Sequence, residues 1–392
     1  MILRNPMTKI QPIQPLAGFR VIDLTRVLSG PFATQILGDL GADIIKIESP
    51  EGDTVRTQGD KVDGFSWYFA GFNRNKRSVV LNLKAEEDKR HLEDLIKSAD
   101  VLIENFRPGV MDRLGLGPER LSELRPGLVT CSVTGFGSYG PYSKRPAFDF
   151  IAQAMSGFMS SNGRESDPPM RSGLPISDLV TGIYAALGVT AALLRRERNG
   201  DGDHVDVSLT NSMISLLAYL ASNYFASGRI TPRSGNDHPI AAPYGLFETA
   251  DTPIAVAPND DVFFGRLMDA LELSDLKTDP EFANNHLRVK NRDRLNAFVL
   301  GRLTTNTASY WVEKLNDAGV PCSHVYDIDG VFLDPQVQSQ EMSMPLQHPK
   351  YGEIKVLGFP MKFKNAPCQI RFHPPDLGEN TADILNEVGG TS

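Results

Sequence analysis

The stretch Gly18–Glu48 decides the fold, and it is GFRVIDLTRVLSGPFATQILGDLGADIIKIE. FRVIDL and DIIKI near its two ends are short runs of strand type, and Pro31–Leu40 between them has the pattern of a helix. The alternation continues with the strand-like runs SVVLNL, VLIEN and LVTCSV and with the helical stretch Ala85–Ala99. Such alternation is typical of a largely parallel sheet covered by helices, so we predict an α/β fold.

Four loops that follow predicted strands or precede predicted helices form the expected ligand surface. They span residues 25–31, 48–57, 105–115 and 134–145 and are rich in Gly, Pro, Arg and Asn. Ligands of parallel α/β sheets bind in loops at the carboxyl ends of the strands. We therefore expect the functional site in these loops.

The length of 392 residues favours two domains, or one large domain with a long insertion. Residues 226–243, ASGRITPRSGNDHPIAAP, are predicted to be a linker because Gly, Pro and polar residues dominate them. One long apolar helix is predicted before this linker, at Leu209–Phe225, and a smaller α/β piece after it. Periodicity alone leaves open whether the tail rejoins the first domain.

Composition excludes several classes of protein. The net charge of −8 argues against a nucleic-acid partner. Apolar residues make up 41% of the chain, but no apolar run reaches the roughly 20 residues that a bilayer requires, so no membrane partner is expected. The three cysteines are widely separated, which fits a reducing compartment. The histidines form no metal-binding motif. The N-terminal segment lacks the apolar core of a signal peptide. We expect a cytoplasmic protein without a bound metal.

Asp178 stands at the start of an apolar helical pattern, within MRSGLPISDLVTGIYAAL at residues 170–187. Spacing alone favours a helix N-cap, in which the carboxylate accepts the free N–H groups of the first turn. The second interpretation is a nucleophile: an ionised carboxylate attacks a thioester carbonyl, forms a mixed anhydride and releases a thiolate without any metal. At this stage both interpretations stay open.

Gly135–Gly140 matches the pattern GxGxxG, but PYSKRP follows it where a dinucleotide site requires a helix, so we reject a nicotinamide site. A glycine-rich turn that approaches a phosphate beside Lys144 and Arg145 remains open. Two further basic clusters lie at residues 73–77 and 105–113. Together such loops would form a pocket for phosphates and an aromatic base, which is the chemistry of coenzyme A.

Several motifs in order along the chain resemble the family III CoA-transferases, a group that includes formyl-CoA transferase, carnitine CoA-transferases and 2-methylacyl-CoA racemases. They are GFRVIDLTRVLSGPFATQILGDLGADIIKIE, FNRNKRSVVLNLK, IENFRPGVMDRLGLG, GFGSYGPYSKRPAFDFIAQAMSG, SDLVTGIYAALG and PPDLGENT. The resemblance extends from Leu16 to about Val388.

The resemblance implies a Rossmann-like large domain built from residues 1–225 and 335–392, a small α/β domain at 244–334, and an interlocked homodimer. It implies that Asp178 is the catalytic nucleophile and that a coenzyme A thioester is a substrate, with no cofactor bound permanently. The implied coenzyme A contacts are Val27, Asn75, Lys76, Asn105, Phe106, Arg113, Lys144 and Arg145.

Two departures from the family narrow the implied activity. Phe148 stands where the racemases carry a catalytic histidine, so the second acid/base group for racemisation is missing. Leu28 stands where formyl-CoA transferases carry a glutamine. The likeness is greatest to the succinyl-CoA:glutarate type, which transfers coenzyme A between dicarboxylic acids. A remote carboxylate requires a cation, and Arg26, Arg56 and Arg74 are the candidates. The alternatives are a racemase or lyase acting on acyl-CoA, and a non-catalytic acyl-CoA-binding protein.

Overall fold

The computed structural model describes residues 13–389, which divide into two compact units. Unit 1 contains the described parts of Met1–Ser156 and Gln338–Ser392 together with Gly173–Leu217. Unit 2 contains Gly157–Ser172 and Ala218–Val337. The domain boundaries expected from the sequence, at residues 225, 243 and 335, stay predictions.

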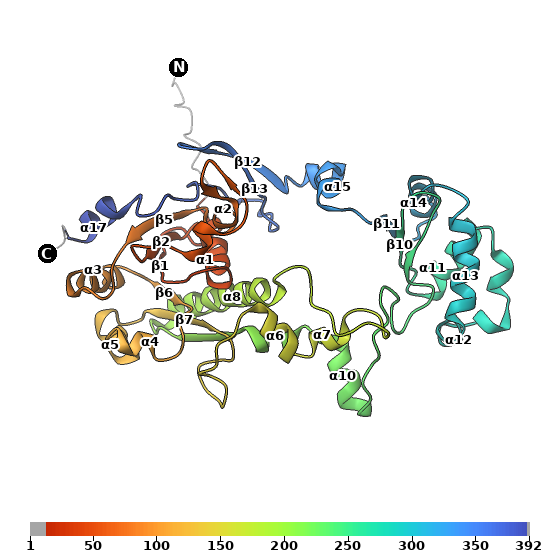
Figure 1. Ribbon diagram of the computed structural model, residues 1–392, viewed down its shortest axis with the longest axis horizontal. Helices are drawn as coiled ribbons and strands as arrows, with labels where there is room; N and C mark the ends of the chain where they lie inside the picture. The colour runs from red at the N-terminus through yellow and green to blue at the C-terminus, as the bar shows by residue number, and fades with distance from the viewer. Residues whose placement is uncertain (1–12, 390–392) are drawn as a thin grey trace, which may run out of the picture. The chain divides into compact units, whose positions relative to one another are not determined.

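A six-stranded parallel sheet forms the centre of unit 1 (Figure 1). Its strands are β1 (Arg20–Asp23), β2 (Asp43–Glu48), β5 (Lys76–Val80), β6 (Val101–Glu104), β7 (Val129–Thr134) and β8 (His204–Ser208). Their order across the sheet is β5-β2-β1-β6-β7-β8, and every neighbouring pair is parallel. The strand order reverses between β1 and β6, which is the Rossmann arrangement, and ligands of such sheets bind at that reversal. The predicted α/β fold with a parallel sheet is confirmed.

The two faces of the sheet are buried by different helices because successive strand residues point to opposite faces. Val21 and Ile44 belong to the core that contains α1 (Ser29–Asp39) and α8 (Ile176–Asn199). Ile22 and Ile45, one position later in each strand, belong to the other core. The helices of that second core are α3 (Glu86–Lys97), α5 (Pro118–Leu124) and α17 (Thr381–Gly389).

The C-terminal segment returns to the sheet of unit 1. The Asn380 N–H donates to the carbonyl of Ser78 at 2.9 Å, and Ile384 of α17 is fully buried in the second core. Glu387 forms ion pairs with Arg20 and Arg77 from β1 and β5. The sheet is therefore completed by residues from both ends of unit 1.

α8 packs against α1 through a very close approach of the two backbones. A Cβ atom at Gly182 would lie 2.8 Å from the carbonyl oxygen of Ser29, so a larger residue there would force the helices apart. Within residues 13–389, α8 is the one helix long and apolar enough to cross a membrane by length and composition. Ala185 and Val189 are fully buried in the core with α1, which explains part of that apolar character.

The remaining elements of unit 1 surround this core. They are α2 (Trp67–Asn73), α4 (Val110–Arg113), α6 (Asp149–Met155), α9 (Leu209–Ser215), the short 3-10 helix η1 (Thr54–Thr57) and the antiparallel pairs β3 (Lys61–Val62) with β4 (Phe65–Ser66) and β12 (Ser343–His348) with β13 (Gly352–Leu357).

Unit 2 contains a three-stranded antiparallel sheet in the order β11-β10-β9, with strands Cys322–His324, Ile254–Val256 and Gly245–Phe247. Trp311 is buried at its core. The helices of unit 2 are α7 (Phe158–Ser161), α10 (Ala218–Ser227), α11 (Asp261–Ala270), α12 (Asn285–Lys290), α13 (Arg292–Leu303), α14 (Ala308–Asp317), α15 (Ile328–Leu333) and α16 (Pro335–Ser339, which extends into unit 1), with 3-10 turns at Ser274–Lys277 and Pro280–Phe282.

The single helix predicted at residues 209–225 is wrong. The structure has two helices, α9 and α10, because the chain turns after Ser215 and Ala218 adopts a left-handed conformation with φ 48°.

Candidate active site

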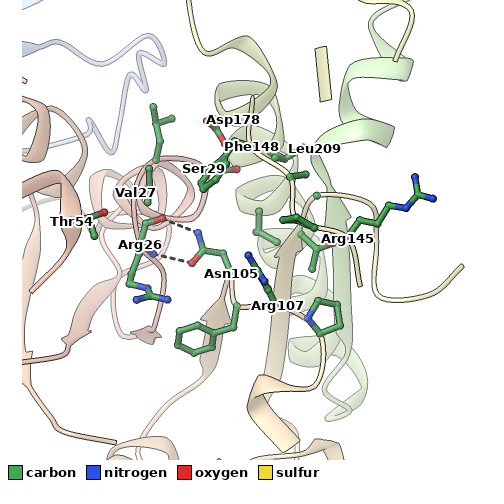
Figure 2. A pocket seen from close by; sticks show the side chains of 18 of the residues that line it. Arg26, Val27, Ser29, Thr54, Asn105, Arg107, Arg145, Phe148, Asp178 and Leu209 are labelled. Carbon is green, nitrogen blue, oxygen red and sulfur yellow. Dashed lines mark hydrogen bonds between the residues drawn. The ribbon is translucent and has the colours of Figure 1, made fainter. Parts of the chain in front are cut away.

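A cavity of about 590 Å³ opens at the carboxyl ends of β1, β6 and β7 in unit 1 (Figure 2). The loops that follow these three strands form most of its wall, as expected for the point where the strand order reverses. The lining residues are Arg26, Val27, Leu28, Ser29, Thr54, Gln58, Asn105, Phe106, Arg107, Pro108, Val133, Thr134, Gly135, Ser143, Arg145, Pro146, Ala147, Phe148, Asp178 and Leu209.

The loop after β1 is held in place by polar side chains. The amide of Asn105 brackets Arg26, accepting from its N–H at 2.9 Å and donating to its carbonyl at 2.8 Å (Figure 2). Val27 has φ 71°, a conformation that is rare and costly for a β-branched residue. Its N–H donates to the carboxylate of Asp53 at 3.2 Å, and Asp53 forms a fully buried ion pair with Lys46 at 3.1 Å. The surrounding structure therefore fixes this wall of the cavity.

Asp178 lies in the first turn of α8, and its side chain lines the cavity. The N-cap expected at this position is wrong, because α8 begins at Ile176 and its N-cap residue is Pro175. Asp149 of α6 takes the capping role instead. Its Oδ1 accepts from the N–H of Ser177 at 2.9 Å and from the hydroxyl of Ser177 at 2.8 Å. The carboxylate of Asp178 is thereby left available to the cavity.

The environment of Asp178 disfavours its charge. Burial raises the pKa of Asp178, the neighbouring charge of Asp149 adds to the effect, and together they bring it to about 7. No side chain among residues 13–389 forms a hydrogen bond or ion pair with this carboxylate in the structure. The sequence-based expectation of a carboxylate held ionised by a helix cap is corrected: near neutral pH the group is close to half protonated.

The structure brings four of the expected coenzyme A contacts to the cavity: Val27, Asn105, Phe106 and Arg145. Arg113 and Lys144 lie outside its lining, as do Asn75 and Lys76. Asn75 is buried and donates to Asp39 at 2.8 Å, and the fully buried Lys76 pairs with Asp23 at 3.1 Å. These interactions give Asn75 and Lys76 a place in the core, and coenzyme A contact by either stays a prediction.

The arginines expected to bind a remote carboxylate occupy different surroundings. Arg26 lines the cavity, with its guanidinium 5.5 Å from the ring centroid of Phe106. Arg56 is paired with Glu48 and Arg74 with Asp39, each at 2.7 Å, and both lie outside the lining. Leu28 and Phe148, the two positions expected to narrow the activity, both line the cavity.

Sequence reasoning did not single out several lining residues, among them Ser29, Thr54, Arg107 and Leu209. Arg107 lies in the loop after β6, which was already part of the expected ligand surface, so its position in that loop was the available signal. Ser29 begins α1 and lies in the loop at residues 25–31, which was also part of the expected ligand surface, whereas Leu209 begins α9, where nothing in the local pattern indicates a cavity.

The glycine-rich turn at residues 135–140 is stabilised by its own N–H groups. The Gly137 N–H donates to the hydroxyl of Thr134 and the Ser138 N–H donates to Asp206, both at 2.9 Å. Gly135 lines the cavity. Two of the N–H groups in this turn are therefore committed to internal hydrogen bonds.

The described part of the chain contains no group of three or more His, Cys, Asp or Glu side chains that could hold a metal ion. The titratable group of the cavity with a strongly perturbed pKa is Asp178, and perturbed groups in clefts are typical of catalytic sites. A carboxylate without a counter-charge, three arginines and several apolar side chains share this one cavity.

The chain therefore has a Rossmann-type sheet with a carboxylate of raised pKa in the cavity at its carboxyl edge. The family model of CoA-transferase family III matches residues 16–381, and the chain belongs to this family. The chain is therefore a transferase, as the sequence motifs predicted.

Individual relatives support this assignment over nearly the whole chain. Human succinyl-CoA:glutarate CoA-transferase is 36% identical over 386 residues, which cover 98% of this chain and 88% of the relative. Acetyl-CoA:oxalate CoA-transferase of Acetobacter aceti is 42% identical over 357 residues, covering 91% and 90%. The crystal structure of a CAIB/BAIF family protein from Brucella suis has a TM-score of 0.87 and 38% identity, covering 96% of this chain and 100% of that chain.

Proposed function

We propose that this enzyme transfers coenzyme A from an acyl-CoA donor, succinyl-CoA or a related dicarboxyl-CoA, to a dicarboxylic acid. Relatives named for succinyl-CoA with glutarate or mesaconate support a diacid substrate. The observation that carries the proposal is Asp178, a carboxylate without a counter-charge in a cavity that also contains Arg26, Arg107 and Arg145. These arginines provide local positive charge for anionic substrates in a chain of net charge −8.

The proposed mechanism uses Asp178 as a covalent nucleophile. Its carboxylate adds to the donor thioester carbonyl, and collapse of the adduct expels coenzyme A thiolate and leaves an aspartyl–acyl anhydride. The thiolate then attacks the aspartyl carbonyl, which releases the donor acid and leaves an aspartyl-CoA thioester. The acceptor acid repeats these steps in reverse. One thioester is broken and one is made, so no ATP is consumed.

Arg26 is the arginine that we propose for the remote carboxylate of the diacid, because Arg56 and Arg74 already have carboxylate partners. Arg26 forms no ion pair among the described residues. Replacement by Gln is expected to raise the KM of a dicarboxylate about tenfold or more and to leave that of a monocarboxylate within about threefold. Equal effects on both acids would exclude Arg26 from this role.

A second copy of the chain is proposed to cover an apolar surface of unit 1. Phe150 and Ile151 of α6, Ile183 and Leu187 of α8, and Ile214 of α9 are exposed, and these three helices contact one another. Large exposed apolar patches mark interaction sites. The interlocked form of the dimer is a family expectation, and a cytoplasmic location stays a prediction. Sedimentation of the purified protein as a monomer at micromolar concentration would exclude the dimer.

Incubation of the protein with several acyl-CoAs and a panel of mono- and dicarboxylic acids, followed by mass spectrometry, tests the activity. We expect new dicarboxyl-CoA species, and hydroxylamine added with donor alone is expected to leave a hydroxamate on Asp178. A strict preference for monocarboxylates would contradict the substrate class. Solvent deuterium at the α-carbon of a 2-methylacyl-CoA would instead favour a racemase, for which the phenyl group of Phe148 provides no proton acceptor.

A further inference from the structure

The N-terminus of α1 lies at the wall of the cavity, which Leu28 and Ser29 line. This helix runs over Ser29–Asp39, and its N-cap residue Leu28 provides no side-chain cap. Among residues 13–389 no acceptor is found for the N–H groups of Ser29 and Gly30, and Pro31 has no N–H. The first turn of a helix leaves such N–H groups unsatisfied and carries partial positive charge.

The side chain of Ser29 adds a third donor at the same place. Ser29 is only 4% exposed, and its hydroxyl oxygen has no hydrogen-bond partner. A buried hydroxyl without a partner costs free energy, so it calls for a functional or structural reason. Ser29 lines the cavity, and Figure 2 shows its side chain at the same end as Phe148 and Asp178.

The packing of α8 on α1 places Asp178 at this end of α1. Gly182 approaches the carbonyl oxygen of Ser29 so closely that a Cβ atom would lie 2.8 Å away. Asp178 precedes Gly182 by four residues on the same helix, so both lie on the same face of α8, one turn apart. A thioester carbon attacked by Asp178 would therefore lie near the first turn of α1.

We propose that the hydroxyl of Ser29 and the N–H groups of Ser29 and Gly30 form the oxyanion site of this enzyme, which binds the carbonyl oxygen of the acyl-CoA thioester. The proposal rests on the proposed transfer function. When the Asp178 carboxylate adds to the carbonyl carbon, the π electrons of the C=O bond move to oxygen. The three donors stabilise that negative charge until the C=O double bond re-forms and the C–S bond breaks, which releases the thiolate. No proton is transferred in this step.

A pair of matched serine variants tests the catalytic role. Ser29→Ala removes the proposed donor, and Ser212→Ala removes another buried hydroxyl without a partner, on α9 and outside the cavity lining. We expect Ser29→Ala to lower kcat roughly 10- to 100-fold, since loss of one oxyanion donor costs about 100- to 1,000-fold in well-studied sites and two donors remain here. Ser212→Ala is expected to stay within about twofold of the unmodified protein.

The pH profile of kcat/KM shows whether the Ser29 hydroxyl acts on the oxyanion of the substrate or on the carboxylate of Asp178. For Ser29→Ala we expect the plateau of kcat/KM to fall with its midpoint unchanged, because the lost donor acts on the substrate. A shifted midpoint with an unchanged plateau would assign the hydroxyl to Asp178 and overturn the proposal. A kcat equal to that of Ser212→Ala would overturn it as well.

Anion binding provides a readout that needs no turnover. In crystals of Asp178→Asn soaked in bromide, anomalous scattering is expected to locate a bromide at hydrogen-bond distance from the Ser29 hydroxyl and the Gly30 N–H, and the added Ser29→Ala change is expected to remove it. Absence of bromide from this position would overturn the site. The proposed function would fail if the unmodified protein did not transfer coenzyme A between any pair of substrates. The bromide experiment would still show in that case whether the first turn of α1 binds an anion.

Discussion

Asp23 and Asp178 are two carboxylates of unit 1 that are withdrawn from water, yet their pKa values move in opposite directions. Burial acts to raise the pKa of both. At Asp23 the charges of Lys76 and Lys46 and the hydroxyls of Thr25 and Thr34 outweigh burial, so its pKa falls below the ordinary value. At Asp178 the charge of Asp149 adds to burial and no cation opposes it. The counter-charge therefore distinguishes the carboxylate that is ion-paired in the core from the one that we propose as the nucleophile.

The largest effect is expected on transfer activity when the proposed nucleophile, Asp178, is replaced. Asp178→Asn keeps the shape of the side chain and removes the nucleophile, so kcat for coenzyme A transfer is expected to fall at least about 1,000-fold. Steady-state assays of acyl-CoA formation by liquid chromatography measure this loss. The far-ultraviolet circular dichroism spectrum serves as the control for folding. Transfer within tenfold of the unmodified rate would exclude covalent catalysis by Asp178.

The same Asp-to-Asn substitution at Asp23 is expected to lower the stability of the fold. Asp23→Asn leaves the fully buried Lys76 without its carboxylate, and breaking a buried ion pair costs about 3–5 kcal/mol. Urea unfolding followed by circular dichroism measures the change. Asp43→Asn is the matched control, because its ion pairs with Arg20 and Arg77 are partly exposed and are expected to contribute less than about 1 kcal/mol. Equal losses of unfolding free energy for Asp23→Asn and Asp43→Asn would contradict the expectation that a buried ion pair contributes more than a partly exposed one.

The dependence of the transfer rate on pH tests the raised pKa of Asp178. Because burial and Asp149 raise the pKa of Asp178 to about 7, kcat/KM is expected to rise with pH through that value and then level. Below the midpoint the rate should fall about tenfold for each pH unit. A rate constant that is flat from pH 5 to pH 8 would show that the nucleophile keeps an ordinary carboxyl pKa.

Asp149→Asn separates the two causes of that shift. Asn keeps an oxygen that accepts from Ser177 and so preserves the start of α8, but it removes the like charge. We expect the midpoint of the pH profile to fall below that of the unmodified enzyme and to stay above the ordinary carboxyl value, because burial remains. An unchanged midpoint would assign the whole shift to burial.

The smallest expected effect is a gain of stability when the charge of Asp178 is removed. A carboxyl whose folded pKa is raised from 3.8 to about 7 stabilises the fold below pH 3.8, and that contribution is lost as the pH rises through about 7. Asp178→Asn should therefore unfold at a higher temperature than the unmodified protein at pH 8, with a smaller difference at pH 5. Thermal unfolding at the two pH values measures it, and a larger gain at pH 5 would contradict the sign.

The sheet was predictable from the sequence because the residues that indicate each strand are neighbours in the chain. Val21 and Ile22, or Ile44 and Ile45, are apolar in succession, as strands buried on both faces require, and a helical pattern separates the two pairs. The loop at residues 105–115 and the importance of Asp178 followed from position relative to strands and from family motifs.

The features that the sequence did not indicate concern residues whose partners are remote in the chain. The cap of α8 comes from Asp149 in another helix, so the pattern around Asp178 could not indicate it. Asn75 and Lys76 belong to a cluster that looks like a solvated basic loop, yet Lys76 points to Asp23 in the core. Ser29 lies in the expected ligand loop at residues 25–31, but its missing hydrogen-bond partner and the close packing of α8 on α1 could not be read from the sequence.

The return of the C-terminal segment to the sheet has a consequence for synthesis. The hydrogen bond from Asn380 to Ser78 closes a very long loop, and contacts of large sequence separation slow folding. Unit 2 is encoded within that loop, so its residues leave the ribosome before the segment that completes unit 1. Unit 1, which holds the cavity, must therefore wait until the segment that follows unit 2 has been synthesised, with part of its second core uncovered until α17 arrives.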